Sequence, residues 1–114
     1  MSEEKFDAIV VGAGVAGCVA AYVLAKEGLD VLVIERGNYA GSKNMTGGRL
    51  YAHSLERVMP GFAEEAPVER LVTREKISFI TDDDSVTLDY HTGEAFSAAA
   101  ASYTVLRGKF DQWL

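Results

Sequence analysis

The chain has 114 residues, a length that allows one domain of ordinary size. It carries 17 acidic and 11 basic side chains, a net charge of −6, and 48% of its residues are hydrophobic. This composition excludes a disordered chain and a basic nucleic-acid-binding protein, so we expect no nucleic-acid partner. Residues 54–96 contain ten acids and four bases and therefore hold the whole excess charge. An acidic middle segment lies between two balanced ends.

The longest uncharged stretch, residues 8–25, has the length of a membrane span or of a signal-peptide core. Residues 1–7 before it carry three acids and one lysine, whereas a secretory signal begins with positive charge. Three glycines also interrupt the stretch. We therefore expect no transmembrane segment. The single cysteine, Cys18, cannot form an internal disulfide, and a cytoplasmic location is the simplest interpretation.

The N-terminal third has the pattern of a βαβ unit. Residues 6–11 are a β-branched apolar run, typical of a strand buried on both faces of a parallel sheet. A glycine turn at residues 12–17 follows, and apolar residues then recur at helical spacing until Gly28. A second apolar strand over residues 30–34 ends at Glu35. This order predicts an α/β fold with a Rossmann-like unit.

The glycine turn suits a dinucleotide. Gly12 permits a tight turn, Gly14 lets the backbone approach a pyrophosphate, and Gly17 lets the helix pack close to the sheet. Val15 and Ala16 begin the helix, whose N-terminus offers unpaired N–H groups and a partial positive charge to phosphates. The pattern therefore predicts a phosphate-binding turn.

Glu35 lies at the end of the second strand, where a carboxylate can accept hydrogen bonds from ribose hydroxyls. It would repel a 2′-phosphate, which disfavours NADP. The glycine pattern does not separate FAD from NAD, because both carry an ADP moiety. Cys18, on the first helical turn, is either a thiol of low pKa or, as we favour, a small packed side chain.

A second segment, residues 41–49, is rich in glycine, small polar side chains and cations. By composition it is either a flexible surface loop or the lining of a phosphate, ribityl chain or flavin edge. Composition alone leaves both interpretations open.

Three motifs in series resemble the FixC-type flavoproteins, which are relatives of electron-transfer-flavoprotein:quinone oxidoreductase and, more distantly, of geranylgeranyl reductases and aromatic hydroxylases. The motifs lie at residues 35–37, 43–51 and 102–114, and the resemblance runs through nearly the whole chain. It implies an FAD-dependent oxidoreductase, a FixC-like dehydrogenase. Such a protein would move electrons from an electron-transfer flavoprotein towards a quinone or a ferredoxin-like acceptor.

The resemblance also implies which residues contact FAD in an extended conformation. The pyrophosphate and adenosine would lie against Gly12, Gly14, Val15, Ala16, Gly17, Glu35 and Arg36. The ribityl and isoalloxazine portions would lie beside Lys43, Asn44, Thr46, Gly47 and Gly48.

Arg107 would reach back towards the same cofactor. Its guanidinium suits a phosphate, because it can form a bidentate fork. A cation at the start of a helix opposes the helix dipole, which indicates that Arg107 has another partner. A solvated charge is the alternative.

Three parts follow from the resemblance: an FAD-binding unit and flavin-side loop (residues 1–53), the start of a substrate domain (54–96), and a return to the FAD-binding domain as a strand and a helix (97–114). In the middle part, residues 53–59 are typical of a short helix stopped by a Pro-Gly pair. Residues 68–81 and 86–90 predict two antiparallel strands joined by an acidic turn. The expected architecture is thus a βαβ unit with an inserted β-hairpin.

No metal ligand or catalytic side chain is predicted. Residues 82–84 are three aspartates without the Gly and Glu of a calcium loop, and His53 and His91 have no cysteine at zinc spacing. No Ser–His–Asp set or carboxylate pair stands at a useful spacing. The chemistry would therefore be that of the cofactor.

Large apolar residues at 106, 110, 113 and 114 follow helical spacing, so the sequence would stop inside an amphipathic helix. We therefore expect an incomplete fragment of a two-domain flavoprotein. The alternatives are a non-catalytic module that binds NAD or another ADP-containing ligand, and an inactive fragment. A peripheral position at the inner face of the membrane is an alternative to a purely cytoplasmic one.

Overall fold

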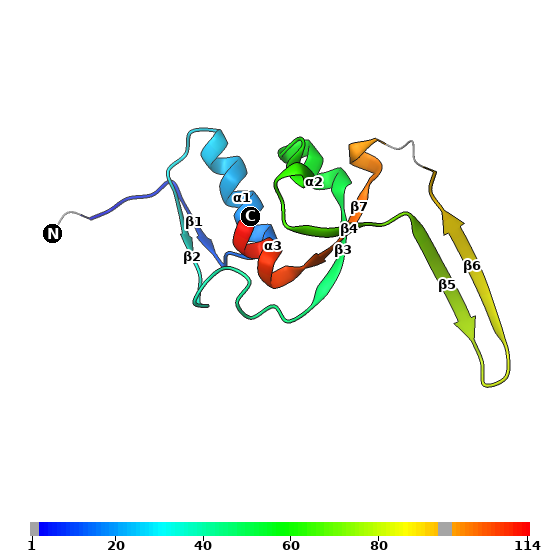
Figure 1. Cartoon of the computed structure of the whole chain (residues 1–114). Helices are drawn as coiled ribbons and strands as arrows, with labels where there is room; N and C mark the ends of the chain where they lie inside the picture. The colour runs from blue at the N-terminus through cyan, green and yellow to red at the C-terminus, as the bar shows by residue number, and fades with distance from the viewer. Residues whose placement is uncertain (1–2, 94–96) are drawn as a thin grey trace.

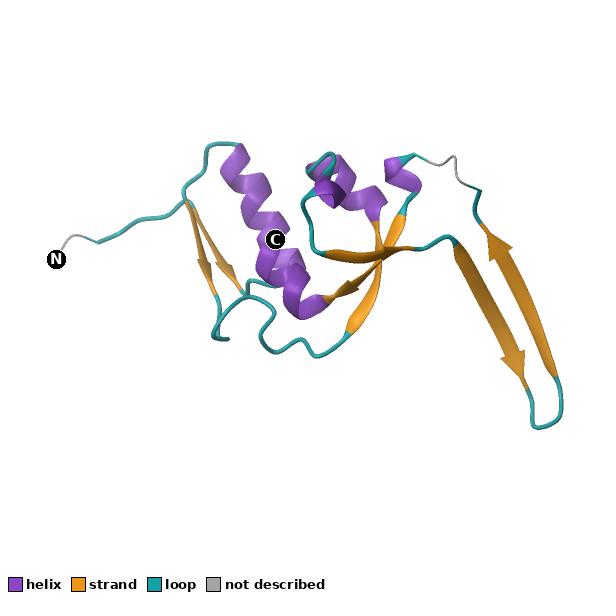
Figure 2. Ribbon diagram, in the orientation of Figure 1, coloured by secondary structure: helices purple, strands orange, loops and turns teal. Residues whose placement is uncertain are grey.

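The computed structural model describes residues 3–93 and 97–114. The strands form three small sheets, and Figures 1 and 2 show helices beside two of them, while the third, a β-hairpin, extends alone. The elements in chain order are β1 (Ala8–Val11), α1 (Val15–Lys26), β2 (Val31–Ile34), β3 (Gly47–Tyr51), α2 (Ala52–Val58), the 3₁₀ turn η1 (Phe62–Glu64), β4 (Val68–Leu71), β5 (Arg74–Ile80), β6 (Ser85–His91), the 3₁₀ turn η2 (Ala98–Ala100), β7 (Ser102–Leu106) and α3 (Arg107–Trp113).

The predicted βαβ unit is confirmed. β1 and β2 pair in parallel, with Ala8 opposite Val31 and Val11 opposite Ile34, and α1 connects them. The helix ends where Gly28 adopts a φ of +85°, a left-handed conformation that favours glycine. In Figure 1, α1 lies beside this two-stranded sheet.

A second sheet lies at the centre of the chain, in the order β3-β7-β4, and both pairings are antiparallel. Its strands come from the three predicted parts of the chain, one from each of 1–53, 54–96 and 97–114. The division into parts stays a prediction, and residues 94–96, which end the middle part, lie outside the described residues.

The hydrophobic core packs on this central sheet. Its buried members lie on α2, η1, β7 and α3 and in the residues just after η1 and η2: Ala52, Leu55, Phe62, Ala66, Ala101, Val105 and Phe110. Val15 and Val19 of α1 pack against the same cluster. The core therefore joins the βαβ unit to the central sheet through these two α1 side chains.

The predicted single strand over residues 68–81 is wrong. It divides at Val72 and Thr73 into β4, which pairs with β7, and β5, which pairs with β6. Both residues at the division are β-branched and suit extended backbone. No glycine or proline there marks the end of one strand and the start of the next. The predicted hairpin is confirmed in its second half, where residues 81–84 join β5 to β6.

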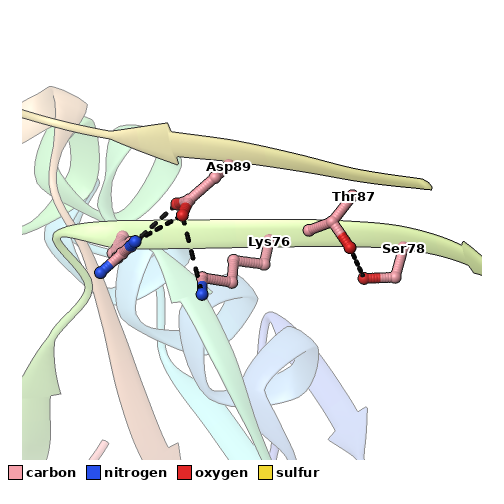
Figure 3. A network of polar contacts seen from close by, with 5 residues as sticks. Lys76, Ser78, Thr87 and Asp89 are labelled. Carbon is pink, nitrogen blue, oxygen red and sulfur yellow. Dashed lines mark hydrogen bonds and ion pairs between the residues drawn. The ribbon is translucent and has the colours of Figure 1, made fainter. Parts of the chain in front are cut away.

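The β5–β6 hairpin has one polar and one apolar face, because directly opposed residues of antiparallel strands share a face. On the polar face Arg74 and Lys76 contact Asp89, and the hydroxyls of Ser78 and Thr87 lie 2.8 Å apart (Figure 3). The apolar face carries exposed Ile77, Phe79, Val86, Leu88 and Tyr90. No described residue covers this face.

The hairpin extends away from the rest of the chain in Figure 1. The radius of gyration is accordingly 18.5 Å, against about 13 Å for a compact domain of this length. Within residues 3–93 and 97–114, no helix has both the length and the apolar character that crossing a membrane requires.

Candidate functional site

The carboxyl ends of β1 and β2 meet at one edge of their sheet. The register sets Val11 opposite Ile34, and the N–H of Gly12 donates to the carbonyl of Ile34 at 2.7 Å. The next residues along each strand, Gly12 and Glu35, therefore leave the sheet side by side. Gly12 has a φ of +100°, which a side chain would strain. This is the edge where open α/β sheets bind ligands.

The glycines of the turn differ in their surroundings. A Cβ on Gly17 would lie 1.9 Å from the carbonyl oxygen of Gly12 and 3.2 Å from Cγ1 of Val10, so α1 lies against the strand end at a distance that only glycine permits. A Cβ on Gly14 would meet no atom within 4 Å. The space in front of Gly14 is thus open, and no side chain caps the helix that begins there.

Glu35 is tied to the glycine turn. Its carboxylate accepts hydrogen bonds from the N–H of Gly37 at 2.6 Å and from the N–H of Ala13 at 2.9 Å. These two donors, more than the Lys43 ammonium 3.6 Å away, lower the pKa of Glu35 below its ordinary value. Each oxygen keeps a further lone pair, so the carboxylate can still accept hydroxyl groups.

An open cavity of about 560 Å³ lies at this edge. Its lining is apolar on the strand ends and polar elsewhere, from Val11, Gly12, Ile34, Glu35, Arg36 and Lys43. Four of the residues predicted to contact the cofactor, Gly12, Glu35, Arg36 and Lys43, therefore line one cavity, although up to 31 positions separate them in the sequence. Val15 and Ala16 lie elsewhere, along an apolar groove of about 340 Å³ between α1 and α2.

The remaining nominated residues gather around the start of α3. The N–H of Arg107 donates to the carbonyl of Thr46 at 3.1 Å, and Gly47 and Gly48 pair with the end of β7. A Cβ on Gly47 would lie 2.8 Å from the carbonyl oxygen of Val105. Residues 41–46 are thus a loop, as predicted, but Gly47 and Gly48 already belong to β3.

Arg107 has a partner that the sequence reasoning missed. Its Nε and Nη2 donate to the two carboxylate oxygens of Asp111, at 2.7 and 2.9 Å, and Asn44 donates to the same carboxylate. This ion pair raises the pKa of Arg107 further. The spacing of four residues on a helix was a readable signal for the pair. The contact between Asn44 and Asp111, which are 67 positions apart, left no such signal in the sequence.

The surroundings of Cys18 disfavour the thiolate. Burial, then the negative charges of Asp111 and Glu35, raise its pKa, and its thiol donates to the carbonyl of Ala13 at 3.4 Å. This direction contradicts the alternative of a low-pKa thiol, and burial is the largest cause. His53 and His91 are exposed. Among the described residues no cluster of His, Cys, Asp or Glu could hold a metal ion.

Comparison with known proteins identifies the family. The family model described as FAD dependent oxidoreductase matches residues 7–111. The chain belongs to the family of FAD-dependent oxidoreductases. The resemblance to FAD-dependent flavoproteins is thereby confirmed, and so is FAD, not NAD, as the cofactor of the family.

Among relatives of this FAD-dependent family, the chain is 68% identical to the probable electron transfer flavoprotein-quinone oxidoreductase YdiS of Escherichia coli K12. It is 67% identical to protein FixC of Salmonella typhi and 43% identical to protein FixC of Rhizobium meliloti. The three matches include all 114 residues of this chain. The chain spans only 26 to 27% of the length of these relatives.

The fold is similar to a crystal structure of a geranylgeranyl bacteriochlorophyll reductase-like protein from Thermoplasma acidophilum. The TM-score is 0.73 at 27% identity, and the match covers 96% of this chain and 26% of that one. The α/β architecture thus recurs in a solved structure.

The residues at the β1–β2 edge fit the ADP half of FAD. The open space at Gly14, uncapped helix N–H groups and a carboxylate with free lone pairs match a pyrophosphate and a ribose. The cavity beside them falls within the usual range of ligand clefts, about 300 to 1,000 Å³. The cations Arg36 and Lys43 at this cavity also suit a ligand that carries phosphate.

Proposed function

We propose that this chain forms the FAD-binding part of an oxidoreductase that takes electrons from an electron-transfer flavoprotein and passes them towards a quinone or a ferredoxin-like acceptor. The observation that carries the proposal is the convergence of Gly12, Glu35, Arg36 and Lys43 on one cavity at the carboxyl edge of β1 and β2. The donor and the quinone are supported by the name of the relative YdiS. The ferredoxin-like acceptor rests on the FixC resemblance alone.

At the ADP end, the pyrophosphate would lie before Gly14 and the first turn of α1, where the N–H groups are free and the helix dipole favours negative charge. Gly12 and Gly17 would set the turn that brings the helix there. Glu35 would accept the ribose hydroxyls with its remaining lone pairs, and Arg36 would lie against the adenosine.

At the flavin end, the backbone and side chains that follow β2 would contact the cofactor. The residues proposed are Lys43, Asn44, Thr46, Gly47, Gly48 and Arg107, whereas Val15 and Ala16 belong to the first turn of α1 at the pyrophosphate end. Support comes from the way residues 41–48 wrap the start of α3, which fixes their backbone close to Arg107.

When bound, FAD supplies the capacity to accept and release electrons, which no protein side chain in this chain offers. The chain's own residues would bind and orient it. Nζ of Lys43 lies 3.6 Å from Oε1 of Glu35, and the N–H of Gly37 donates to the same oxygen, so the residues after β2 already contact the strand end. A site whose parts are held before binding loses less entropy when the ligand arrives.

The β5–β6 hairpin would belong to the start of the substrate domain, residues 54–96. Its apolar face, with Phe79 66% and Leu88 60% exposed, needs a covering layer to be stable in water. The relatives are close to four times as long as this chain, so their additional length suffices for such a layer.

The electron-transfer proposal is tested with the full-length protein that contains this sequence. The protein is loaded with FAD, mixed anaerobically with reduced electron-transfer flavoprotein, and followed by flavin absorbance in a stopped-flow instrument. We expect bleaching of the bound flavin, followed by recovery when a water-soluble quinone is added.

Two controls make the result specific. NADH in place of the donor flavoprotein should bleach the flavin far more slowly. Oxidised ferredoxin in place of the quinone shows which of the two acceptors restores the flavin absorbance. A flavin that stays oxidised with the donor flavoprotein would overturn the proposed donor. Binding of FAD without any electron exchange would leave a binding module, the alternative raised by the sequence.

A further inference from the structure

The carboxylate of Asp111 is the most enclosed charged group in the described part of the chain. The residue is 1% exposed and its side chain 0%. Three donors surround it: Nε of Arg107 at 2.7 Å, Nη2 of Arg107 at 2.9 Å, and Nδ2 of Asn44 at 2.5 Å. A buried carboxylate with this donor set is stable only while its partners stay in place.

Asp111 sits where α3 meets the loop after β2. A Cβ on Gly41 would lie 2.7 Å from Cβ of Asp111, and the φ of Gly41 is +80°. The N–H of Asn44 donates to the carbonyl of Gly41 at 2.9 Å, which closes the loop on itself. The N–H of Arg107 donates to Thr46 at 3.1 Å. Loop and helix are therefore joined by side-chain and backbone bonds around one carboxylate.

The Arg107–Asp111 ion pair is not well placed to stabilise α3 by itself. α3 has only seven residues, and Arg107 stands at its N-terminus, where a cation opposes the helix dipole. The Arg107 side chain is 37% exposed, whereas that of Asp111 is enclosed. Asp111 thus holds one edge of the guanidinium, Nε and Nη2, and directs the other edge outwards.

We propose that Asp111 is a positioning residue for FAD: through Arg107 and Asn44 it fixes the guanidinium and the flavin-side loop in the arrangement that binds the cofactor. The inference rests on the proposed function. Asp111 itself does not touch the cofactor. Its carboxylate also offsets the positive charge of Arg107, so the pair presents hydrogen-bond donors to the flavin region with little net charge.

The test is a double-mutant cycle in the full-length protein, with Asp111→Asn, Arg107→Gln and both together. The dissociation constant of FAD is measured by quenching of flavin fluorescence. We expect Asp111→Asn to weaken binding by about tenfold, the lower end of the effect of removing a group that orients a metal ligand. In the Arg107→Gln background the same change should have almost no further effect. If the double variant weakens FAD binding by the product of the two single effects, the proposal is wrong.

A second readout separates positioning from structural support. Asp111→Asn leaves the charge of Arg107 without its counter-charge, so the midpoint potential of the bound flavin should become more positive, because a cation stabilises the reduced form. The double variant should return to the potential of Arg107→Gln. An unchanged potential in Asp111→Asn would overturn the proposal, whatever the affinity.

The matched control is Asp89→Asn, which removes a carboxylate that also binds an arginine, Arg74, through both oxygens. It lies on the hairpin, and neither affinity nor potential should change. If Asp111→Asn does not fold, the FAD affinity of Asn44→Ala is measured instead, because this variant keeps the Arg107–Asp111 ion pair. An unchanged FAD affinity in Asn44→Ala contradicts the proposal. If the wild type binds no FAD, the proposed function fails; if it binds FAD and Arg107→Gln binds equally well, this inference alone fails.

Discussion

Gly17→Ala tests the close packing on which the glycine turn depends. The added methyl carbon would lie 1.9 Å from the carbonyl oxygen of Gly12 and 3.1 Å from its carbonyl carbon. Both are backbone atoms, so no side chain can rotate away. Reaching an ordinary carbon–oxygen contact of about 3.4 Å requires the start of α1 to move by about 1.5 Å from the strand end.

That displacement has two consequences. Forcing an extra carbon into packed structure costs about 1–3 kcal/mol of unfolding free energy, and we expect the upper part of this range because the neighbour is rigid. The movement also withdraws the helix N–H groups from the proposed pyrophosphate position. A misplacement of about 1 Å can cost on the order of 100-fold in function, so FAD affinity should fall at least tenfold.

Gly14→Ala is the matched control, because it adds the same atom three residues away where nothing lies within 4 Å and φ is −77°. The apo-protein should keep its thermal midpoint to within the small effect of a helix cap, yet lose FAD affinity, because the methyl occupies the proposed ligand space. Differential scanning fluorimetry and FAD titration of both variants give the answer. A Gly17→Ala protein with unchanged stability and affinity would refute the packing argument.

Three further predictions concern titrating groups. Backbone donors lower the pKa of Glu35, so the stability that Glu35 contributes is present above its ordinary pKa of 4.5 and disappears as pH falls through the lowered pKa. Glu35→Gln should therefore flatten the acid limb of a plot of unfolding free energy against pH. An unaltered acid limb would contradict this. The pKa of Asp89 is lowered to about 2, mainly by the side chain of Arg74, and NMR titration should show it return towards 3.8 in Arg74→Gln. Cys18 should react with iodoacetamide more slowly than free cysteine at pH 7; faster alkylation would disagree with its raised pKa.

Local pattern predicted the βαβ unit because each of its parts carries its own signal. Apolar strands, helical spacing and glycines with special backbone needs all lie within 30 consecutive positions, and α1 ends where Gly28 indicated. The convergence on one cavity could also be expected, since parallel strands bring Gly12 and Glu35 to a common edge.

Pairing between distant segments could not be predicted in the same way. β4 leaves the hairpin because its partner is β7, more than 30 positions later, and no residue between Leu71 and Arg74 marks the change. Asp111 was overlooked for a related reason. Its spacing to Arg107 is local, but its importance comes from Asn44 and Gly41, which only the folded chain brings to it.

Binding of FAD through the glycine turn and Glu35 can be measured by equilibrium titration of the full-length apo-protein with FAD and with NAD. We expect a yellow complex with one FAD per chain and little competition from NAD. Glu35→Ala should weaken FAD binding about tenfold, through the loss of hydrogen bonds to the ribose. A protein that binds NAD more tightly than FAD, or whose Glu35→Ala variant binds FAD as the wild type does, would contradict this mode of binding.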